Sequence, residues 1–234
     1  MSQAYAIRGR RARVERPSRA GPRWRGLTGH SQVVILRAMN IILLLALIKA
    51  LALGAAAAEW PVLTKGSTLK WTGTKVTGAH NGSVALKSGS VVVDGKKLAG
   101  GQFEIDMNSI TVEDLQGGSK DKLTAHLKSA DFFEVDKYPT AKFVIKKVSP
   151  LKNDKEGNTH TVSGELTMKG KTKPLSFPAR ISVGDKSAEA VAKVKVDRTK
   201  WDVRYGSGKF FKGLGDKMIH DEFTLDLDLK AAKK

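Results

Sequence analysis

The chain has 234 residues, 41% of them hydrophobic and 27% charged, and a formal net charge of +18. A chain of this length can bury one sizeable core and is too short for two large domains. It contains no cysteine, which excludes disulfide bonds and thiolate metal sites.

The first quarter of the chain is basic and then apolar. Residues 1–58 hold nine Arg, one Lys and one Glu, a sum of +9, so another +9 belongs to the rest of the chain. The apolar run ends in Ala56, Ala57 and Ala58, the small-residue pattern at which signal peptidase cleaves. We therefore predict a basic Arg-rich extension over 1–38 that is untranslated or disordered, a signal peptide over 39–58, and a mature domain over 59–234.

The start codon of this leader and its fate after synthesis each have an alternative interpretation. Arg dominates before Met39 whereas Lys dominates in the mature domain, which favours Met39 as the true start codon. A retained N-terminal membrane anchor is the alternative to cleavage, because about 18 apolar residues approach the length of a membrane span. Lys49 interrupts the run and its end is rich in Ala, so cleavage and export are the expectation.

From Trp60 onward, apolar and polar residues alternate, which is typical of half-buried antiparallel strands. In the clearest run, Phe223, Leu225, Leu227 and Leu229 share one face. Turn-type sequences separate the alternating runs at 80–83, 93–97, 152–158, 169–174 and 183–187. Roughly eight such runs predict an all-β fold, a sandwich or a closed barrel.

Two regions of the chain break the alternation: residues 119–143 and residues 205–217. In Ser119–Ser129, two Leu residues lie four positions apart and Ser119 can cap the first turn, which predicts a short helix. An aromatic segment follows at 130–143, and a second irregular segment at 205–217 carries two adjacent Phe residues between glycines. These segments could meet at one end of a closed barrel.

Five stretches, in order from Trp71 to Leu229, resemble the YceI-like family of bacterial envelope proteins. They are WTGTKVTGAHNGSVALKSGSV, GGQFEIDMNSI, HLKSADFFEVDKYPTAKF, GELTMKGKTKPLSFPA and VDRTKWDVRYGSGKFFKGLGDKMIHDEFTLDLDL. The resemblance implies an eight-stranded antiparallel lipocalin-like barrel whose long apolar interior holds a polyisoprenoid or related amphiphile. The basic extension before Met39 departs from the family pattern.

The function implied by this resemblance is that of a periplasmic carrier for a long-chain isoprenoid, quinone or fatty-acid-like lipid, with transient membrane contact. The residues alone leave open whether the interior is filled or hollow. Small residues on apolar faces favour a hollow interior but also fit the taper of a barrel; they are Ala179, Ala190, Ala192, Gly100 and Gly101.

The candidate site has an apolar wall and a polar opening. The residues expected to line the path of the tail are Phe103, Ile105, Met107, Phe132, Tyr138, Phe143, Phe177, Ala192, Val194, Phe210, Phe211, Phe223 and Leu225. The cations expected to meet a head group are Arg198, Lys200, Arg204 and Lys209.

Other classes of function have weaker support in the sequence. The five His residues show no H-x-x-H spacing, and no nucleophile elbow, Walker loop or dinucleotide fingerprint occurs, so we expect neither catalysis nor a metal. The alternative is a basic envelope stress protein that binds acidic surfaces or nucleic acid without a lipid cavity. Lys residues are spread over nearly every strand and turn, which fits solubility better than a nucleic-acid groove.

Overall fold

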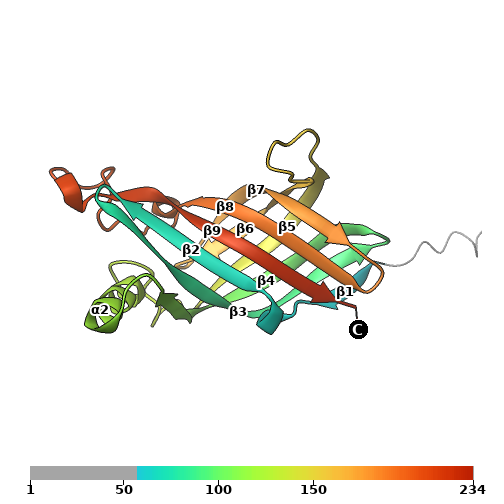
Figure 1. The fold of residues 1–234 in the computed structure, drawn as a ribbon, viewed down its shortest axis with the longest axis horizontal. Helices are drawn as coiled ribbons and strands as arrows, with labels where there is room; N and C mark the ends of the chain where they lie inside the picture. The colour runs from blue at the N-terminus through green and yellow to red at the C-terminus, as the bar shows by residue number, and fades with distance from the viewer. Residues whose placement is uncertain (1–56, 234) are drawn as a thin grey trace, which may run out of the picture. The chain divides into compact units, whose positions relative to one another are not determined.

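The computed structural model describes residues 57–233 (Figure 1). The predicted basic extension, and the signal peptide or membrane anchor up to residue 56, lie outside the described residues. Ala58, the last residue of the predicted signal peptide, is the first residue of strand β1. Ala55–Lys234 forms a compact unit by itself.

The described chain consists mainly of antiparallel strands that close into a barrel. Strands β2 to β9 each pair with their neighbours, and β3 pairs with both β2 and β4, which closes a barrel of eight strands. β1 pairs with the second half of β3, at Ser90–Val93. The strands are β1 (Ala58–Pro61), β2 (Thr68–Lys75), β3 (Gly78–Asp94), β4 (Lys97–Val112), β5 (Thr140–Pro150), β6 (His160–Met168), β7 (Lys171–Val183), β8 (Ser187–Asp197) and β9 (Ile219–Ala232). The predicted all-β, eight-stranded antiparallel barrel is confirmed.

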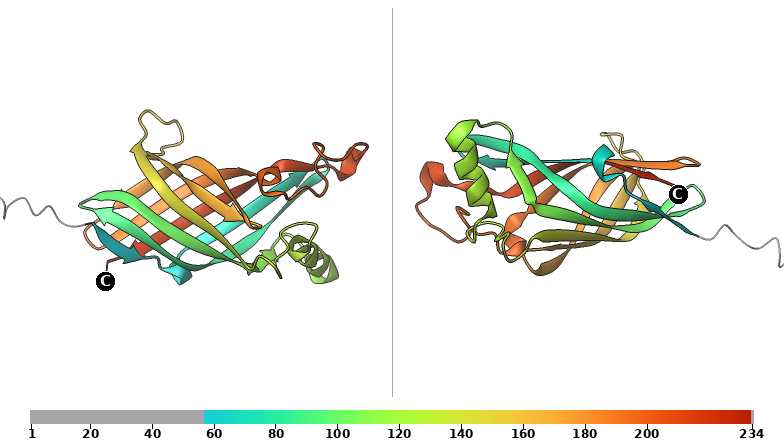
Figure 2. Two further views of the ribbon diagram at one scale, coloured as in Figure 1. Left: turned by 180° about the vertical axis from the view of Figure 1, so that it is seen from behind. Right: turned by 90° about the horizontal axis from the view of Figure 1, so that it is seen from below.

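Within residues 57–233, four short helical elements connect the strands, and α2 is the longest of them. They are η1 (Thr64–Gly66), α2 (Gly117–Lys128), η2 (Arg198–Trp201) and η3 (Gly215–Lys217). Both figures of the ribbon show α2 and the loop between η2 and β9 at the same end of the barrel (Figures 1 and 2). We call this end the α2 end, and the end that carries β1 the β1 end.

The alternation of the sequence sets which side chains face inward. Along β8 and β9, Ala192 lies opposite Leu227 and Val194 opposite Leu225, and all four line the barrel interior. The large inward residues of β9, Phe223, Leu225, Leu227 and Leu229, are half-buried rather than fully buried, because they border empty space instead of packed side chains.

One predicted turn is wrong. Residues 80–83 lie within β3, and the chain reverses earlier, at Val76 and Thr77. The glycine of this segment has a different role, because a Cβ atom on Gly82 would lie 1.8 Å from the carbonyl oxygen of Thr111 on β4. Gly82 therefore permits the close approach of two strands, which a sequence cannot distinguish from a turn.

The helix was predicted correctly, but its N-cap was not. α2 begins at Gly117, which takes a φ of 55°, a conformation that glycine adopts without strain. Ser119 therefore lies inside the first turn, and Gln116 is the N-cap residue, without a capping side-chain hydrogen bond. Leu127 is the buried residue of this helix.

Candidate functional site

Two adjoining cavities occupy the barrel interior, and nearly all the side chains that line them are apolar. The first has a volume of about 990 Å³ and the second about 810 Å³, in both cases with the opening to solvent included. Ile105, Leu166 and Leu225 border both cavities. These three side chains lie where the two cavities adjoin, and we call this place the junction.

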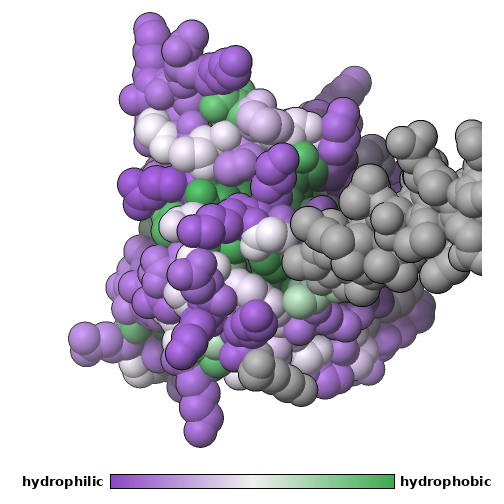
Figure 3. All heavy atoms as spheres, turned by 90° about the vertical axis from the view of Figure 1, so that its right-hand side faces the viewer, coloured by the Kyte–Doolittle hydropathy of each residue, from purple (hydrophilic) through white to green (hydrophobic). Residues whose placement is uncertain are grey.

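The first cavity extends toward the β1 end. Its wall there includes Val91 and Leu98 from the β3–β4 hairpin and Ala188 and Ala231 from β8 and β9. Figure 3 faces this end and shows hydrophobic surface framed by hydrophilic side chains. Ala179, Ala190 and Ala192 all line this cavity, so small side chains do leave room in the interior.

The two glycines that were expected to act in the same way do not line either cavity. Gly101 takes a φ of 154°, and a Cβ atom there would lie 2.6 Å from the carbonyl oxygen of Ser90. Gly100 and Gly101 lie where the register of β3 against β4 shifts. Their role is to allow this strand irregularity rather than to widen the cavity.

The second cavity extends toward the α2 end. Its wall includes Leu127 of α2, Phe132 and Phe133 of the aromatic segment, and Arg198 and His220. The helix and the aromatic segment therefore cover this part of the interior, and Arg198 brings a cation to a wall that, apart from His220, is otherwise apolar.

The two irregular segments of the sequence meet here. The ring of Tyr205 lies 4.5 Å from the ring of His126 and 5.5 Å from that of Phe132, measured between centroids. His126 also makes an edge-on contact with Phe132, at 5.0 Å. The aromatic cluster joins α2, the segment after it and the loop before β9.

Most of the predicted lining residues border a cavity. The first cavity is lined by Phe103, Phe143, Phe177, Ala192 and Val194, the second by Met107, Phe132 and Phe223, and both by Ile105 and Leu225. Tyr138 lies elsewhere, with its ring against Gly170 in the β6–β7 turn. Phe210 and Phe211 are exposed in the loop before β9.

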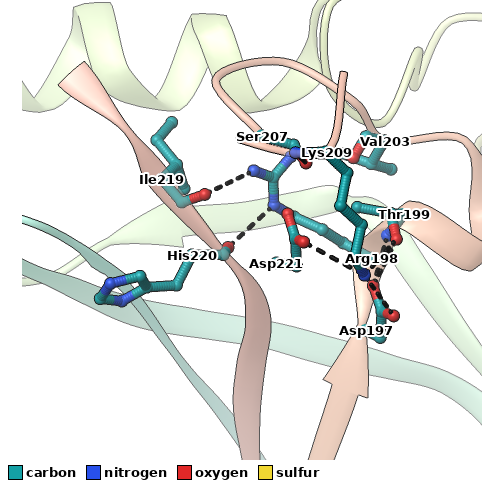
Figure 4. Close-up of polar contacts among 9 residues, drawn as sticks. All are labelled: Asp197, Arg198, Thr199, Val203, Ser207, Lys209, Ile219, His220 and Asp221. Carbon is teal, nitrogen blue, oxygen red and sulfur yellow. Dashed lines mark hydrogen bonds and ion pairs between the residues drawn. The ribbon is translucent and has the colours of Figure 1, made fainter. Parts of the chain in front are cut away.

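Among the four candidate head-group cations, Arg198 lines a cavity. Its side chain is buried, and its guanidinium donates hydrogen bonds to three backbone carbonyls: Nε to His220 at 3.1 Å, and the terminal nitrogens to Val203 at 2.8 Å and Ile219 at 3.1 Å (Figure 4). Burial lowers its pKa, and the charges of Asp221 and Asp197 oppose that effect. Arg198 thus ties the start of β9 to the segment that precedes the loop.

Lys209 forms ion pairs next to this arginine. Its Nζ lies 3.1 Å from a carboxylate oxygen of Asp197 and 3.1 Å from one of Asp221 (Figure 4). Burial raises the pKa of Asp197, but hydrogen bonds from Thr199 and Lys209 outweigh it and hold that pKa below its ordinary value.

The other two predicted cations lie on the surface. Arg204 pairs with Asp202 and places its guanidinium carbon 4.8 Å from the ring centre of Phe210. Lys200 is exposed. Neither side chain borders a cavity.

Sequence reasoning missed several wall residues. Leu166 at the junction and Val162 lie on the inward face of β6, and Leu127 comes from α2. The alternation of β6 could have indicated Val162 and Leu166, whereas the sequence indicated only that the irregular segments could meet at one end of the barrel, and not that Leu127 borders a cavity there.

Within residues 57–233, no helix is long and apolar enough to cross a membrane. The same residues contain no cluster of three or more side chains suited to hold a metal ion.

An eight-stranded barrel is wide enough either to be filled by side chains or to hold one small ligand, and ligand sites are usually cavities with mostly apolar walls. The model of the YceI-like domain matches residues 60–231. The chain belongs to the YceI-like family.

Curated relatives align over part of their length. Protein YceI of Shigella flexneri is 33% identical over 93 residues, 40% of this chain and 44% of that protein. A UPF0312 protein of Shewanella denitrificans is 34% identical over 97 residues, 42% of this chain and 46% of that protein. Each alignment thus spans less than half of the relative.

Two solved structures share the fold. BcnA of Burkholderia cenocepacia superimposes with a TM-score of 0.58 at 23% identity, covering 73% of this chain and 99% of that protein. A polyisoprenoid binding domain from Saccharophagus degradans, implicated in plant cell wall breakdown, has a TM-score of 0.54 at 14% identity, covering 75% of this chain and 98% of that domain. At these identities the likeness concerns the fold alone.

Proposed function

We propose that this protein is a periplasmic carrier that sequesters or shuttles a long-chain isoprenoid or similar amphiphilic lipid, without chemistry of its own. The observation that carries the proposal is the pair of adjoining apolar cavities that share Ile105, Leu166 and Leu225. The polyisoprenoid-binding neighbour from Saccharophagus degradans supports the class of ligand. The predicted signal peptide and membership of the YceI-like family support the periplasmic location.

The energetics of the interior suit a long apolar tail. Each buried methylene contributes about 0.8 kcal/mol, so a five-carbon unit contributes about 4 kcal/mol before the entropy of ordering is subtracted. A polar ligand would lose its hydration and find few hydrogen-bonding partners on such walls. The interior therefore selects for tail length and favours a carrier over a basic surface binder that has no lipid cavity.

Arg198 is the residue that we assign to the polar end of the ligand. A guanidinium has five N–H donors, and the hydrogen bonds to Val203, Ile219 and His220 use three of them. The remaining donors can bind an oxygen of a phosphate, quinone or carboxylate that lies in the second cavity. Lys209 is held by Asp197 and Asp221, and so has less freedom to do so.

The test is to identify the cargo. Protein purified from its native host without detergent is extracted with organic solvent, and the extract is analysed by mass spectrometry. We expect a long-chain lipid in near-stoichiometric amount, whose mass and fragmentation distinguish a polyprenyl phosphate, a quinone and a fatty-acid-like lipid. An extract with no lipid above the level of an unrelated periplasmic protein would contradict the carrier function.

A substitution at the junction tests where the tail lies. Leu225→Trp places a large ring where the two cavities meet, so the longest tail recovered should become shorter or the cargo should be lost. Val191→Trp on the outer face of the neighbouring strand β8 is the matched control, since Val191 is exposed and does not border either cavity. Equal cargo in both variants would contradict a tail that passes the junction.

A further inference from the structure

The exposed large apolar side chains of the described residues are concentrated at one end of the barrel. Tyr205, Phe210 and Phe211, in the loop before β9, are 44%, 46% and 47% exposed, and Val76, at the β2–β3 turn, is 49% exposed. The N–H of Val76 donates to the carbonyl of Met218 at 3.1 Å, so this turn adjoins the loop. The other two side chains of this kind, Leu63 and Val191, lie outside this patch.

The loop also concentrates positive charge. We call residues 204–217 the rim loop; it carries Arg204, Lys209, Lys212 and Lys217 against a single acid, Asp216, a net charge of +3. Arg204 and Lys209 are paired with acids outside the loop, Asp202, Asp197 and Asp221, so the charge open to a partner comes from Lys212 and Lys217. Phe210 and Phe211 stand between Lys209 and Lys212 in the sequence. Aromatic rings flanked by long cationic side chains are the composition of segments that lie at a membrane interface.

The base of the rim loop adjoins the wall of the second cavity. The N–H of Ile219, which lines that cavity, donates to the carbonyl of Gly206 at 2.8 Å. The ring of Tyr205 packs against that of Phe132, another wall residue. Arg198 holds the two residues that flank the rim loop, Val203 before it and Ile219 after it, through hydrogen bonds to their carbonyls. The tip of the loop projects from the α2 end of the barrel (Figures 1 and 2).

From this arrangement we propose that the rim loop docks on an anionic phospholipid surface, with Phe210 and Phe211 at the boundary between head groups and acyl chains. Lys212 and Lys217 then meet lipid phosphates, while Lys209 stays paired with Asp197 and Asp221, and the second cavity faces the membrane. This docking goes beyond the carrier function and does not require an occupied interior.

The shape and charge of the patch favour a membrane over a protein partner. A stable protein interface buries about 800 Å² on each side, which requires a broad complementary surface. The rim loop instead offers two adjacent rings on a single loop that contains four glycines, Gly206, Gly208, Gly213 and Gly215. A small apolar insertion combined with attraction to anionic lipids is sufficient for reversible binding to a bilayer.

The experiment measures binding to vesicles of phosphatidylglycerol and phosphatidylethanolamine, and to vesicles of phosphatidylcholine alone, by flotation. We use the fragment 55–234, which contains the whole closed barrel and forms a compact unit by itself, because the nine Arg of the leader would bind anionic lipid on their own. We expect binding to the anionic vesicles that falls at least about tenfold when salt is raised from about 0.05 to 0.5 M, and weak binding to the phosphatidylcholine vesicles.

Two pairs of variants assign this binding to the rim loop. Phe210→Ser with Phe211→Ser should lower the partition coefficient at least about tenfold, whereas Leu63→Ser with Val191→Thr, at exposed apolar positions elsewhere, should change it less than about twofold. Lys212→Glu with Lys217→Glu should also lower it at least about tenfold. Its matched control is Lys96→Glu with Lys186→Glu, the same charge change in turns at the β1 end.

All the substituted side chains are exposed, so each variant should keep the thermal midpoint of the parent. The proposal is overturned if the parent does not bind anionic vesicles, if the rim variants bind as well as the parent, or if the control charge reversal causes an equal loss. Specific binding of the rim loop to one protein partner, without binding to vesicles, would also overturn it. Cargo is measured on the same preparations, so an empty barrel that still docks contradicts only the carrier function.

Discussion

Enlarging a small wall residue tests whether the barrel interior is hollow. Ala190 on β8 lines the first cavity, lies opposite Ile181 and Leu229 on the neighbouring strands, and is only half-buried. Ala190→Leu adds three carbons, worth about 2.4 kcal/mol if all were buried. Because Ala190 is half-buried, we expect about half of this, an increase of about 1 kcal/mol in the free energy of unfolding of the delipidated protein.

The same substitution occupies space that the tail requires. The lipid recovered from Ala190→Leu should therefore decrease or shift to shorter tails. Stability is measured by urea denaturation of delipidated protein, and cargo by mass spectrometry of protein that has not been delipidated.

A glycine at a tightly packed position provides the contrast. A Cβ atom on Gly164 of β6 would lie 2.3 Å from the carbonyl oxygen of Val144 and 2.6 Å from the ring of Phe143. Gly164→Ala should therefore destabilise the protein by about 1–3 kcal/mol, although it adds only one carbon. If Ala190→Leu destabilised the protein by a similar amount and left the cargo unchanged, the interior would be filled by side chains and the prediction of a hollow barrel would be wrong.

Three further predictions concern the α2 end. Phe132→Ala should cost about 3 kcal/mol of stability and also reduce bound lipid, since Phe132 is buried and lines the second cavity. Tyr138→Ala should leave the lipid content unchanged. The thermal midpoint and the bound lipid are measured on each variant, and a loss of stability in Phe132→Ala with unchanged lipid would contradict its lining role. Arg198→Met leaves three backbone carbonyls without their donor and should lower the free energy of unfolding by about 3 kcal/mol or more, with faster proteolysis in the rim loop. Arg198→Lys should recover only part of the lost stability. Unchanged proteolysis of Arg198→Met would contradict the anchoring role. The pKa of Asp197 is lower in the folded protein than its ordinary value of 3.8, so its ion pair stabilises the fold above pH 3.8 and this contribution is lost as the pH falls further. Asp197→Asn should therefore make the free energy of unfolding depend less on pH in the acid range. An unchanged pH dependence would show that Asp197 does not contribute.

The sequence alone determined much of the fold. Alternation along residues such as Phe223, Leu225, Leu227 and Leu229 fixes which face of each strand is apolar, because side chains on a strand point to opposite sides in turn. The chain reversals within 93–97 and 169–174, each with one glycine, follow from the same local chemistry, as does the short helix that carries Leu127. Most of the proposed wall residues could therefore be named before the structure.

The tertiary structure decided what those residues do. Gly82 resembles a turn residue in the sequence, but the close approach of Thr111 across the sheet explains it. Arg198 looks like any surface cation until the fold buries it among the carbonyls of Val203, Ile219 and His220. Alternation states only that a side chain faces inward; whether it meets another side chain, a cavity or a backbone carbonyl depends on strands far apart in the chain, and that is set only when the barrel closes.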